Sequence, residues 1–338
     1  VLNGGDDTSP TQSFTITVTD VNDEPPFAGG GDVVVLEDSG AYSAPWAGSI
    51  VMGPADEAGQ TGSFNVTGNT NAGLFSVSPG VDGSGGLTFT PTADANGFAD
   101  ITIDLQDDGG VLNGGDDTSA SVTFRITVTD VNDEPGFVSG GDVIVLEDSG
   151  AYSAPWAGSI SMGPVDESGQ NGTFNITANT NPGLFSAAPG VAGSGGLTFT
   201  PTADANGFAD ITIELQDDGG VLNGGDDTSP SVTFRISVTD VNDEPQFVSG
   251  WDVCLFEDSG AYSDGWAGSI SMGPVDEAGQ SPTFNVTGTT NAGLFSAVPA
   301  VDPAGNLTFT PSADGNGTAD ITIELQDDGG VLNGGDDT

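Results

Sequence analysis

The segment ITVTDVNDEPGF at residues 126–137 decides how the chain is organised. Its first half alternates apolar and polar residues, which is the pattern of a half-buried β-strand. Asp130, Asn132, Asp133 and Glu134 follow at once, and a proline then removes a backbone donor. Because no basic residue is nearby, these oxygen-bearing groups would repel one another unless a hard cation such as Ca²⁺ lay among them. The segment therefore predicts a calcium-dependent junction between two domains.

The same segment recurs, with near copies at residues 16–27 and 236–247. Trp46, Trp156 and Trp266 follow one another at intervals of 110 residues. A period of this length indicates duplication of a whole domain and not a short solenoid unit. We expect three domains in a linear array, named here repeat 1 (residues 24–133), repeat 2 (residues 134–243) and repeat 3 (residues 244–338).

The two ends of the chain overlap in sequence, because VLNGGDDT occurs at residues 1–8 and again at 331–338. Residues 1–23 are predicted to be the last strand of another domain, and repeat 3 stops before its own last strand. Two interpretations stay open. The chain is a section of one longer polypeptide, or it is a filament subunit that donates residues 13–21 to repeat 3 of the next subunit.

Within a repeat, apolar and polar residues alternate, and clusters of Gly, Pro, Asn and Asp separate the alternating stretches. The predicted strands of repeat 1 are 33–36, 49–52, 63–67, 74–77, 87–90, 101–105 and 122–128. Seven strands in about 100 residues favour a β-sandwich of the immunoglobulin type. The predicted fold class is all-β, with tandem antiparallel seven-stranded sandwiches.

The composition excludes several classes of partner. The chain has 50 Asp and Glu against 2 Lys and Arg, no His, and a net charge of −48, which excludes nucleic acid. This charge also argues against docking on an anionic membrane, and no apolar run is long enough to span one. The single cysteine, Cys254, rules out an internal disulfide framework. Since it replaces Val34 and Ile144 of the sister repeats, we expect it to be a small buried hydrophobe.

The motif DVNDEPGF at residues 130–137 resembles the cadherin inter-domain motif D-x-N-D-N-x-P-x-F, with Glu134 in place of the last Asn. Essentially the whole chain resembles the cadherin-like and immunoglobulin-like repeats of large bacterial surface proteins. The resemblance implies cadherin-like sandwiches with two or three Ca²⁺ ions at each junction. It also implies an extracellular location, either on the bacterial cell surface or secreted.

The resemblance further implies which residues bind the ions. VLED at residues 35–38 is similar to the first-strand motif, so Glu37 becomes a ligand, and Asn96 stands where the family has Glu. The implied ligands at the first junction are Asp20, Asn22, Asp23, Glu24, Asp56, Glu57 and Asp107. Those at the second are Glu37, Asp94, Asn96, Asp130, Asn132, Asp133, Glu134, Asp166, Glu167 and Asp217. Those at the third are Glu147, Asp204, Asn206, Asp240, Asn242, Asp243, Glu244, Asp276, Glu277 and Asp327, with Glu257, Asp314 and Asn316 at the far end of repeat 3.

Other features have two interpretations. Asp116 and Asp117 could form a further metal site or a plain turn, with equal weight. Tyr42 and Trp46 are interpreted as core residues in preference to carbohydrate platforms, since they recur at fixed positions in each repeat. The acids as a whole could form a solvated, halophile-type surface, but their clustering in doublets disfavours this interpretation.

The predicted function is a calcium-rigidified stalk or fibre of an adhesin that mediates surface or biofilm attachment. One alternative is a carbohydrate- or protein-binding module, and another is the strand-donating filament subunit. An enzyme is disfavoured, because the chain has no His or Lys and its acids recur with the fold. The expected partners are neighbouring repeats or subunits and a surface glycan or protein receptor.

Overall fold

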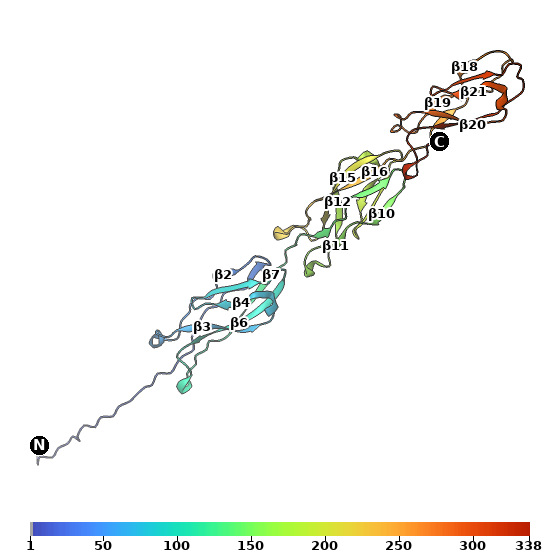
Figure 1. The fold of residues 1–338 in the computed structure, drawn as a ribbon. Coiled ribbons are helices and arrows are strands. Elements are labelled where there is room, and N and C mark those ends of the chain that lie inside the picture. Colours follow the sequence, from blue (N-terminus) through green and yellow to red (C-terminus); the bar gives the residue numbers. More distant parts are fainter. Residues whose placement is uncertain (1–2) are drawn as a thin grey trace. The chain divides into compact units, whose positions relative to one another are not determined.

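The computed structural model describes residues 3–338, so Val1 and Leu2 of the predicted leading strand lie outside the described residues. Short strands and single-turn 3₁₀ helices make up its regular structure (Figure 1). None of the helices in residues 3–338 is long and apolar enough to cross a membrane. The chain divides into two compact units. Unit 1 holds the residues up to Asp133 with Pro164–Ser168 and Val221–Gly225, and unit 2 holds Glu134–Gly163, Gly169–Gly220 and Asp226–Thr338.

Unit 1 contains one sandwich of two sheets. Its strands are β1 (Val33–Leu36), β2 (Tyr42–Pro45), β3 (Gly62–Asn69), β4 (Phe75–Val81), β5 (Gly86–Pro91), β6 (Gly97–Asp107) and β7 (Val122–Thr129). The strand orders are β1-β7-β6-β3 and β2-β5-β4. The 3₁₀ helices η1 (Ala55–Glu57), η2 (Ala72–Leu74) and η3 (Leu112–Gly114) lie in the connections. The predicted all-β fold class is confirmed.

Strand direction differs from the prediction at one place. Most pairs are antiparallel, as predicted, but β1 pairs in parallel with β7, with Val33 opposite Ile126 and Leu36 opposite Thr129. No hairpin joins these two strands, because the rest of the sandwich lies between them, so no tight turn forces them to run in opposite directions. Consequently β1 and β7 both end at the same edge of the sheet.

Two of the local strand predictions for unit 1 need correction. The range 49–52 forms no strand there; next to it, Gly48 forms only an isolated antiparallel bridge with Ala28. Strand β2 was not predicted from the sequence. That strand lies at a sheet edge and ends in Pro45, so its composition resembles a loop.

The core of unit 1 comes from alternate residues of β6 and β7. Ile101, Ile103 and Ile126 are fully buried. Trp46 is 8% exposed, and its ring lies 4.3 Å from that of Phe124, so its prediction as a core residue is confirmed. A Cβ atom at Gly30 would come within 2.6 Å of Trp46, which explains why a glycine is needed beside the indole.

Unit 2 contains the corresponding elements of repeats 2 and 3. The strands of repeat 2 are β8 (Gly136–Val138), β9 (Val143–Leu146), β10 (Tyr152–Pro155), β11 (Gly158–Ser161), β12 (Thr173–Asn179), β13 (Phe185–Val191), β14 (Gly196–Pro201), β15 (Gly207–Gln216) and β16 (Val232–Thr239). Those of repeat 3 are β17 (Gln246–Val248), β18 (Tyr262–Gly265), β19 (Gly268–Ser271), β20 (Thr283–Thr289), β21 (Phe295–Val301), β22 (Asn306–Pro311) and β23 (Ile321–Gln326). Strands β9 and β16 repeat the parallel pairing of β1 and β7.

Repeat 3 departs from its sisters at one sheet edge. Residues 253–256 correspond to β1 and β9, but they form no strand, and none of residues 244–338 forms a strand equivalent to β7. Cys254 is exposed, so the prediction that it is buried is wrong. Residue type was a poor guide at this position, because Val34 and Ile144, which lie in strands of the sister repeats, are themselves 69% and 74% exposed.

Candidate metal sites

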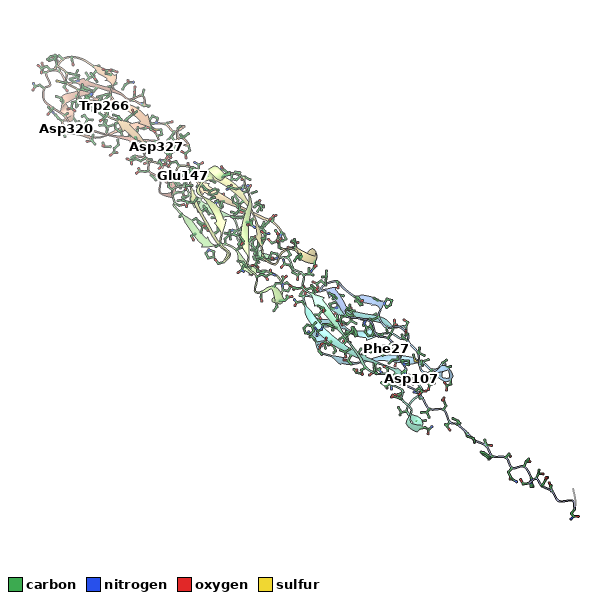
Figure 2. The ribbon with its side chains drawn as sticks, turned by 180° about the vertical axis from the view of Figure 1, so that it is seen from behind. Phe27, Asp107, Glu147, Trp266, Asp320 and Asp327 are labelled. Carbon is green, nitrogen blue, oxygen red and sulfur yellow. The ribbon has the colours of Figure 1, made fainter. Side chains whose placement is uncertain are left out.

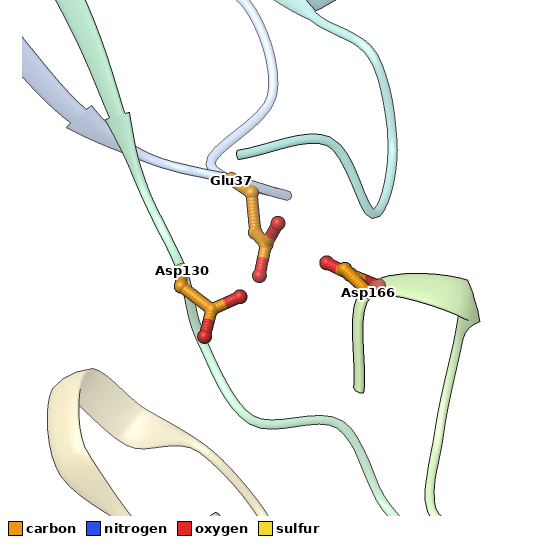
Figure 3. Close-up of side chains that lie close together, drawn as sticks. All are labelled: Glu37, Asp130 and Asp166. Carbon is orange, nitrogen blue, oxygen red and sulfur yellow. The ribbon is translucent and has the colours of Figure 1, made fainter. Parts of the chain in front are cut away.

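Three carboxylates of unit 1 converge just beyond the ends of β1 and β7. Glu37, Asp130 and Asp166 each offer an oxygen, and these oxygens lie within 4.8 Å of one another. Figure 3 shows the three side chains pointing toward a common point. Glu37 follows β1, Asp130 follows β7, and Asp166 lies on η4 (Val165–Glu167). Because β1 and β7 are parallel, the chain delivers Glu37 and Asp130 to the same edge of the sheet.

Glu37 is held rigidly and is only 2% exposed. Its Oε1 accepts a hydrogen bond of 2.6 Å from the backbone N–H of Val131, whereas its buried Oε2 has no hydrogen-bond partner among the described residues. Burial raises the pKa of the Glu37 carboxyl to about 7, although the Val131 hydrogen bond lowers it; the charges of Asp130 and Asp166 add to the rise. A buried acceptor without a donor, next to two further acids, suits a cation.

The two arginines of the chain are engaged elsewhere. Arg125 forms an ion pair of 2.8 Å with Asp100, and Arg235 forms the same pair with Asp210. Since the sequence contains no Lys or His, no other side chain can neutralise the cluster of Glu37, Asp130 and Asp166. Its charge balance has to come from protons or from a bound cation.

A second cluster in unit 1 consists of Asp38, Asp94 and Asp133. Burial raises the pKa of Asp133, and the charges of Asp38 and Asp94 raise it further. The backbone N–H of Asp133 donates to Glu167 at 2.7 Å, and the other carboxylate oxygen of Glu167 is buried without a hydrogen-bond partner among the described residues. Asp38 was not among the predicted ligands. The recurring ED doublet was the available signal, because neighbouring acids at a strand end can serve two adjacent clusters.

Asn96 links two members of the first cluster. Its Nδ2 donates to Asp130 at 2.9 Å and to Asp166 at 2.8 Å. A glutamate at this position would add a charge to the site, whereas the amide connects the carboxylates without one. The structure therefore places Asn96 against the cluster, as a neutral member.

Unit 2 repeats both clusters with the same residue types. One cluster consists of Glu147, Asp240 and Asp276, and the other of Asp148, Asp204 and Asp243. Glu147, labelled in Figure 2, is 1% exposed. Its Oε1 accepts a hydrogen bond of 2.6 Å from the backbone N–H of Val241, and burial raises the pKa of its carboxyl to about 7. Asn206 donates to Asp240 and Asp276, each at 2.8 Å. The residues of the two copies are of the same type and lie 110 positions apart in the sequence.

A different arrangement surrounds the asparagine of the DVND motif. Asn22 donates to Asp107 at 2.9 Å and to the carbonyl of Asp116 at 2.8 Å, and the backbone N–H of Asp23 donates to Glu57 at 2.8 Å. The second carboxylate oxygens of Glu57 and Asp107 are buried without partners among the described residues. In unit 2, Asn242, Asp327 and Glu277 repeat these contacts and the same two unpartnered oxygens.

Several predicted ligands lie outside the four carboxylate clusters found in residues 3–338. The predicted acids among them are Asp20, Asp23, Glu24, Asp56, Glu57, Asp107, Glu134, Glu167, Asp217, Glu244, Glu257, Glu277, Asp314 and Asp327. The predicted amides Asn22, Asn96, Asn132, Asn206, Asn242 and Asn316 carry no carboxylate, but Asn96 and Asn206 donate to cluster carboxylates. Glu24 instead accepts a hydrogen bond from Ala120 N–H at 2.6 Å, and Glu134 is exposed. Glu257 is also exposed, because the preceding residues 253–256 form no strand that would position it.

Asp116 and Asp117 make the hydrogen bonds of a turn. Asp116 accepts from the backbone N–H of Thr118 at 3.2 Å, and Asp117 accepts from the Thr118 hydroxyl at 2.9 Å. Gln106 donates to the other oxygen of Asp117. These contacts favour the plain turn over a further metal site.

Fold and site together define a class of protein: tandem all-β sandwich repeats with clustered carboxylates where paired strands end.

No family model and no curated protein matches the chain. Among solved structures, mouse cadherin-23 EC22-24 is similar, with 15% identity, coverage of 90% of this chain and 94% of that chain, and a TM-score of 0.47. Human CDH23 EC21-23 has 14% identity, coverage of 92% and 96%, and a TM-score of 0.47. Mouse protocadherin-24 EC1-3 has 16% identity, coverage of 97% and 96%, and a TM-score of 0.44.

Proposed function

We propose that the chain is a calcium-rigidified stalk or fibre of an extracellular adhesin, built from repeats 1 to 3 with the bounds given above. One observation carries the proposal: Glu37, Asp130 and Asp166 come from three separate elements yet share one site with an unpartnered buried oxygen. An ion bound there would tie the ends of β1 and β7 to η4. Without it, the three acids repel one another.

The donor chemistry favours Ca²⁺ over other metals. Every candidate ligand offers oxygen, whereas zinc and copper sites draw on the imidazole or thiolate groups that these clusters lack. Mg²⁺ requires a compact octahedral shell and gives up its water reluctantly, whereas Ca²⁺ accepts six to eight oxygens in flexible geometry. Carboxylates that come from separate segments of the chain form the kind of flexible oxygen set that Ca²⁺ accepts.

We assign the ions to the carboxylates of the four clusters, with Asn96 and Asn206 as neutral members. The unpartnered oxygens of Glu57 and Asp107, and those of Glu277 and Asp327, supply a further pair of ligands at each of two places. The acids that remain give the fibre a negative surface that keeps neighbouring fibres apart.

The adhesin role is inferred from the repetition of the sandwich and from the rigidity that bound ions would give it. We place the protein on the bacterial cell surface or in a secreted fibre, where it would attach cells to surfaces or biofilms. A role as a carbohydrate-binding module finds less support, because the recurring Trp46 and Trp156 are 8% exposed, and Trp251, which is 93% exposed, is replaced by glycine in repeats 1 and 2. Catalysis has little support, since the same acids recur at equivalent positions in both units.

Calcium titration of the metal-free chain tests the proposal. We expect the melting temperature to rise with added Ca²⁺ and to rise much less with equal Mg²⁺, because only the larger ion fits the flexible oxygen set. Small-angle scattering in a chelator should show a shorter average particle than in Ca²⁺. Equal melting temperatures and equal dimensions in both conditions would contradict the proposal.

A further inference from the structure

Two groups of Asn-Gly pairs in the chain share a dipeptide but differ in their surroundings. One group lies in the loop that follows β6 and in its counterparts, at Asn113, Asn223 and Asn333. The other group lies at Asn96, Asn171 and Asn206. The dipeptide is chemically special, because a glycine has no Cβ atom that would keep its backbone nitrogen away from the preceding side chain. The two groups therefore allow structure to be separated from sequence.

The loop asparagines are exposed, and their side chains have no hydrogen-bond partner among residues 3–338. Asn113 lies within η3 with a left-handed φ of 57°, and Gly114 follows with a φ of 90°. A Cβ atom at Gly114 would meet no other atom within 4 Å, so the space beside this residue is open. Asn223 and Asn333 repeat the left-handed backbone, with φ of 58° and 61°. Nothing in the loop prevents these side chains from turning toward the next backbone nitrogen.

The asparagines of the other group are held in place. Asn96 and Asn206 each donate from Nδ2 to two carboxylates of a cluster. Asn171 donates to Asp218 from its backbone N–H at 2.8 Å and from Nδ2 at 2.9 Å. These bonds must break before the side chain can turn. The adjacent carboxylates also disfavour loss of a proton from the next backbone nitrogen, because they stabilise no further negative charge.

We propose that Asn113, Asn223 and Asn333 are modification sites at which the chain converts asparagine into aspartate and isoaspartate, with water as the only co-reactant. The backbone nitrogen of the following glycine attacks the asparagine Cγ. An N–Cγ bond forms, the Cγ–Nδ2 bond breaks, and the proton of the backbone nitrogen leaves with Nδ2 as ammonia. Water then adds to either carbonyl carbon of the resulting succinimide ring, and a ring C–N bond breaks. The oxygen of the water stays in the new carboxylate.

The products change the loop in two ways. A neutral amide becomes a carboxylate, so each event adds a negative charge to a chain that already carries a net charge of −48. When water adds to the main-chain carbonyl carbon, the backbone afterwards runs through the former side chain and is longer by a methylene group. A hydrogen bond of 3.1 Å from the N–H of Gly115 to the carbonyl of Leu112 spans Asn113. The longer backbone would break this turn.

The same loop supports the asparagine of the DVND motif. The N–H of Asp116 donates to the Asn22 carbonyl at 2.9 Å, and Asn22 Nδ2 donates back to the Asp116 carbonyl at 2.8 Å. Asn22 Nδ2 also donates to Asp107, which is labelled in Figure 2. Asn242 and Asp336 repeat the reciprocal contact in unit 2, at 2.9 and 2.7 Å. Isoaspartate in the loop would loosen this support, so the modification acts as a slow timer of the repeat.

Peptide mapping of the full chain tests the inference. The folded chain is kept in mildly alkaline buffer made with isotopically labelled water, digested with chymotrypsin in ordinary water and analysed by chromatography and mass spectrometry. The loop asparagines should convert at least roughly tenfold faster than those of the other group, because the latter must first break two hydrogen bonds. Each product should contain a labelled oxygen. In denaturant both groups should convert at similar rates, since they share the dipeptide.

A variant chain tests the effect on the fold. Glutamine would have to close a larger ring, so the triple variant Asn113→Gln, Asn223→Gln and Asn333→Gln should not convert. On storage, the melting temperature of the unmodified chain should fall more than that of the triple variant, each relative to its own starting value. The matched control Asn171→Gln leaves the loops intact and should age like the unmodified chain.

This inference goes beyond the proposed calcium function, because ring closure needs no metal, and it stands even if every cluster fails to bind Ca²⁺. Three results would each overturn it. They are equal conversion of Asn113 and Asn96 in the folded chain, products without labelled oxygen, and the same fall in melting temperature for the triple variant and the unmodified chain.

Discussion

Glu37 accepts a hydrogen bond of 2.6 Å from the backbone N–H of Val131, a residue 94 positions further along the chain. Glu147 and Val241 repeat this contact in unit 2 at the same distance. The bond fixes the orientation of the Glu37 carboxylate, so that the unpartnered Oε2 stays buried beside Asp130 and Asp166. A ligand held in this way loses little freedom when an ion arrives.

The first prediction concerns Asp133, one of the three carboxylates of the second cluster in unit 1. Asp133→Asn should weaken calcium binding at its cluster at least tenfold, or about 1.4 kcal/mol, because a charged ligand becomes neutral while the core is untouched. Isothermal titration calorimetry would measure the change. Glu134→Gln is the matched control, since this neighbour is exposed and lies outside the clusters. Equal losses from both variants would instead indicate a diffuse ion atmosphere around the acidic surface.

The second prediction concerns the amide that joins two carboxylates. Asn96→Glu should strengthen calcium binding several-fold, since it adds a charged ligand to Asp130 and Asp166. In a chelator the same variant should lose about 1 kcal/mol of stability, because two hydrogen bonds to carboxylates are replaced by charge repulsion. Thermal melts with and without Ca²⁺ would show the opposite signs. Asn96→Gln, which adds no charge, should not strengthen binding, and an identical response from both would refute the charge argument.

The third prediction is an inverted pH dependence of stability in the absence of metal. The pKa of Glu37 and that of Glu147 are raised from 4.5 to about 7 in the folded chain, so the folded state binds more protons than the unfolded state between these values. The free energy of unfolding should therefore fall as pH rises through this window. In chelator, we expect a lower melting temperature at about pH 7.5 than at about pH 5.5.

Calcium should reverse this order, because the ion binds the ionised carboxylates and binding becomes stronger as they lose their protons. The combined variant Glu37→Gln and Glu147→Gln should flatten the metal-free pH dependence, since neither amide titrates. A melting temperature that rises from about pH 5.5 to about pH 7.5 in chelator would show that the two buried glutamates do not control stability.

The fourth prediction tests the packing of β7 in the sandwich. Ile126→Ala should cost about 2–5 kcal/mol, because Ile126 is fully buried and the change leaves a cavity. Val34→Ala, on the outward side of β1 and 69% exposed, should change stability by less than about 0.5 kcal/mol. Urea denaturation followed by tryptophan fluorescence would measure both. Comparable costs would mean that the two faces of the sheet are not distinguished as described.

Strand periodicity was readable from the sequence because it is local. Ile101, Ile103 and Ile126 alternate with polar residues, and all three are fully buried. The direction of β1 relative to β7 was not readable, since it depends on the path of the whole sandwich between them. The burial prediction for Cys254 failed for a related reason: hydrophobic residue type alone does not say which side of a strand faces the core, and Val34 and Ile144 face outward.

The parallel pairing of β1 and β7 also determines how a repeat would respond to a pulling force. The chain enters the sandwich before β1 and leaves it after β7, so tension on its two ends would slide one strand along the other. The pairs from Val33–Ile126 to Leu36–Thr129 would resist in shear as a group, instead of unzipping one at a time. An ion held by Glu37 and Asp130 would clasp both strands just beyond the last of these pairs. Calcium concentration would then set the load at which a repeat yields.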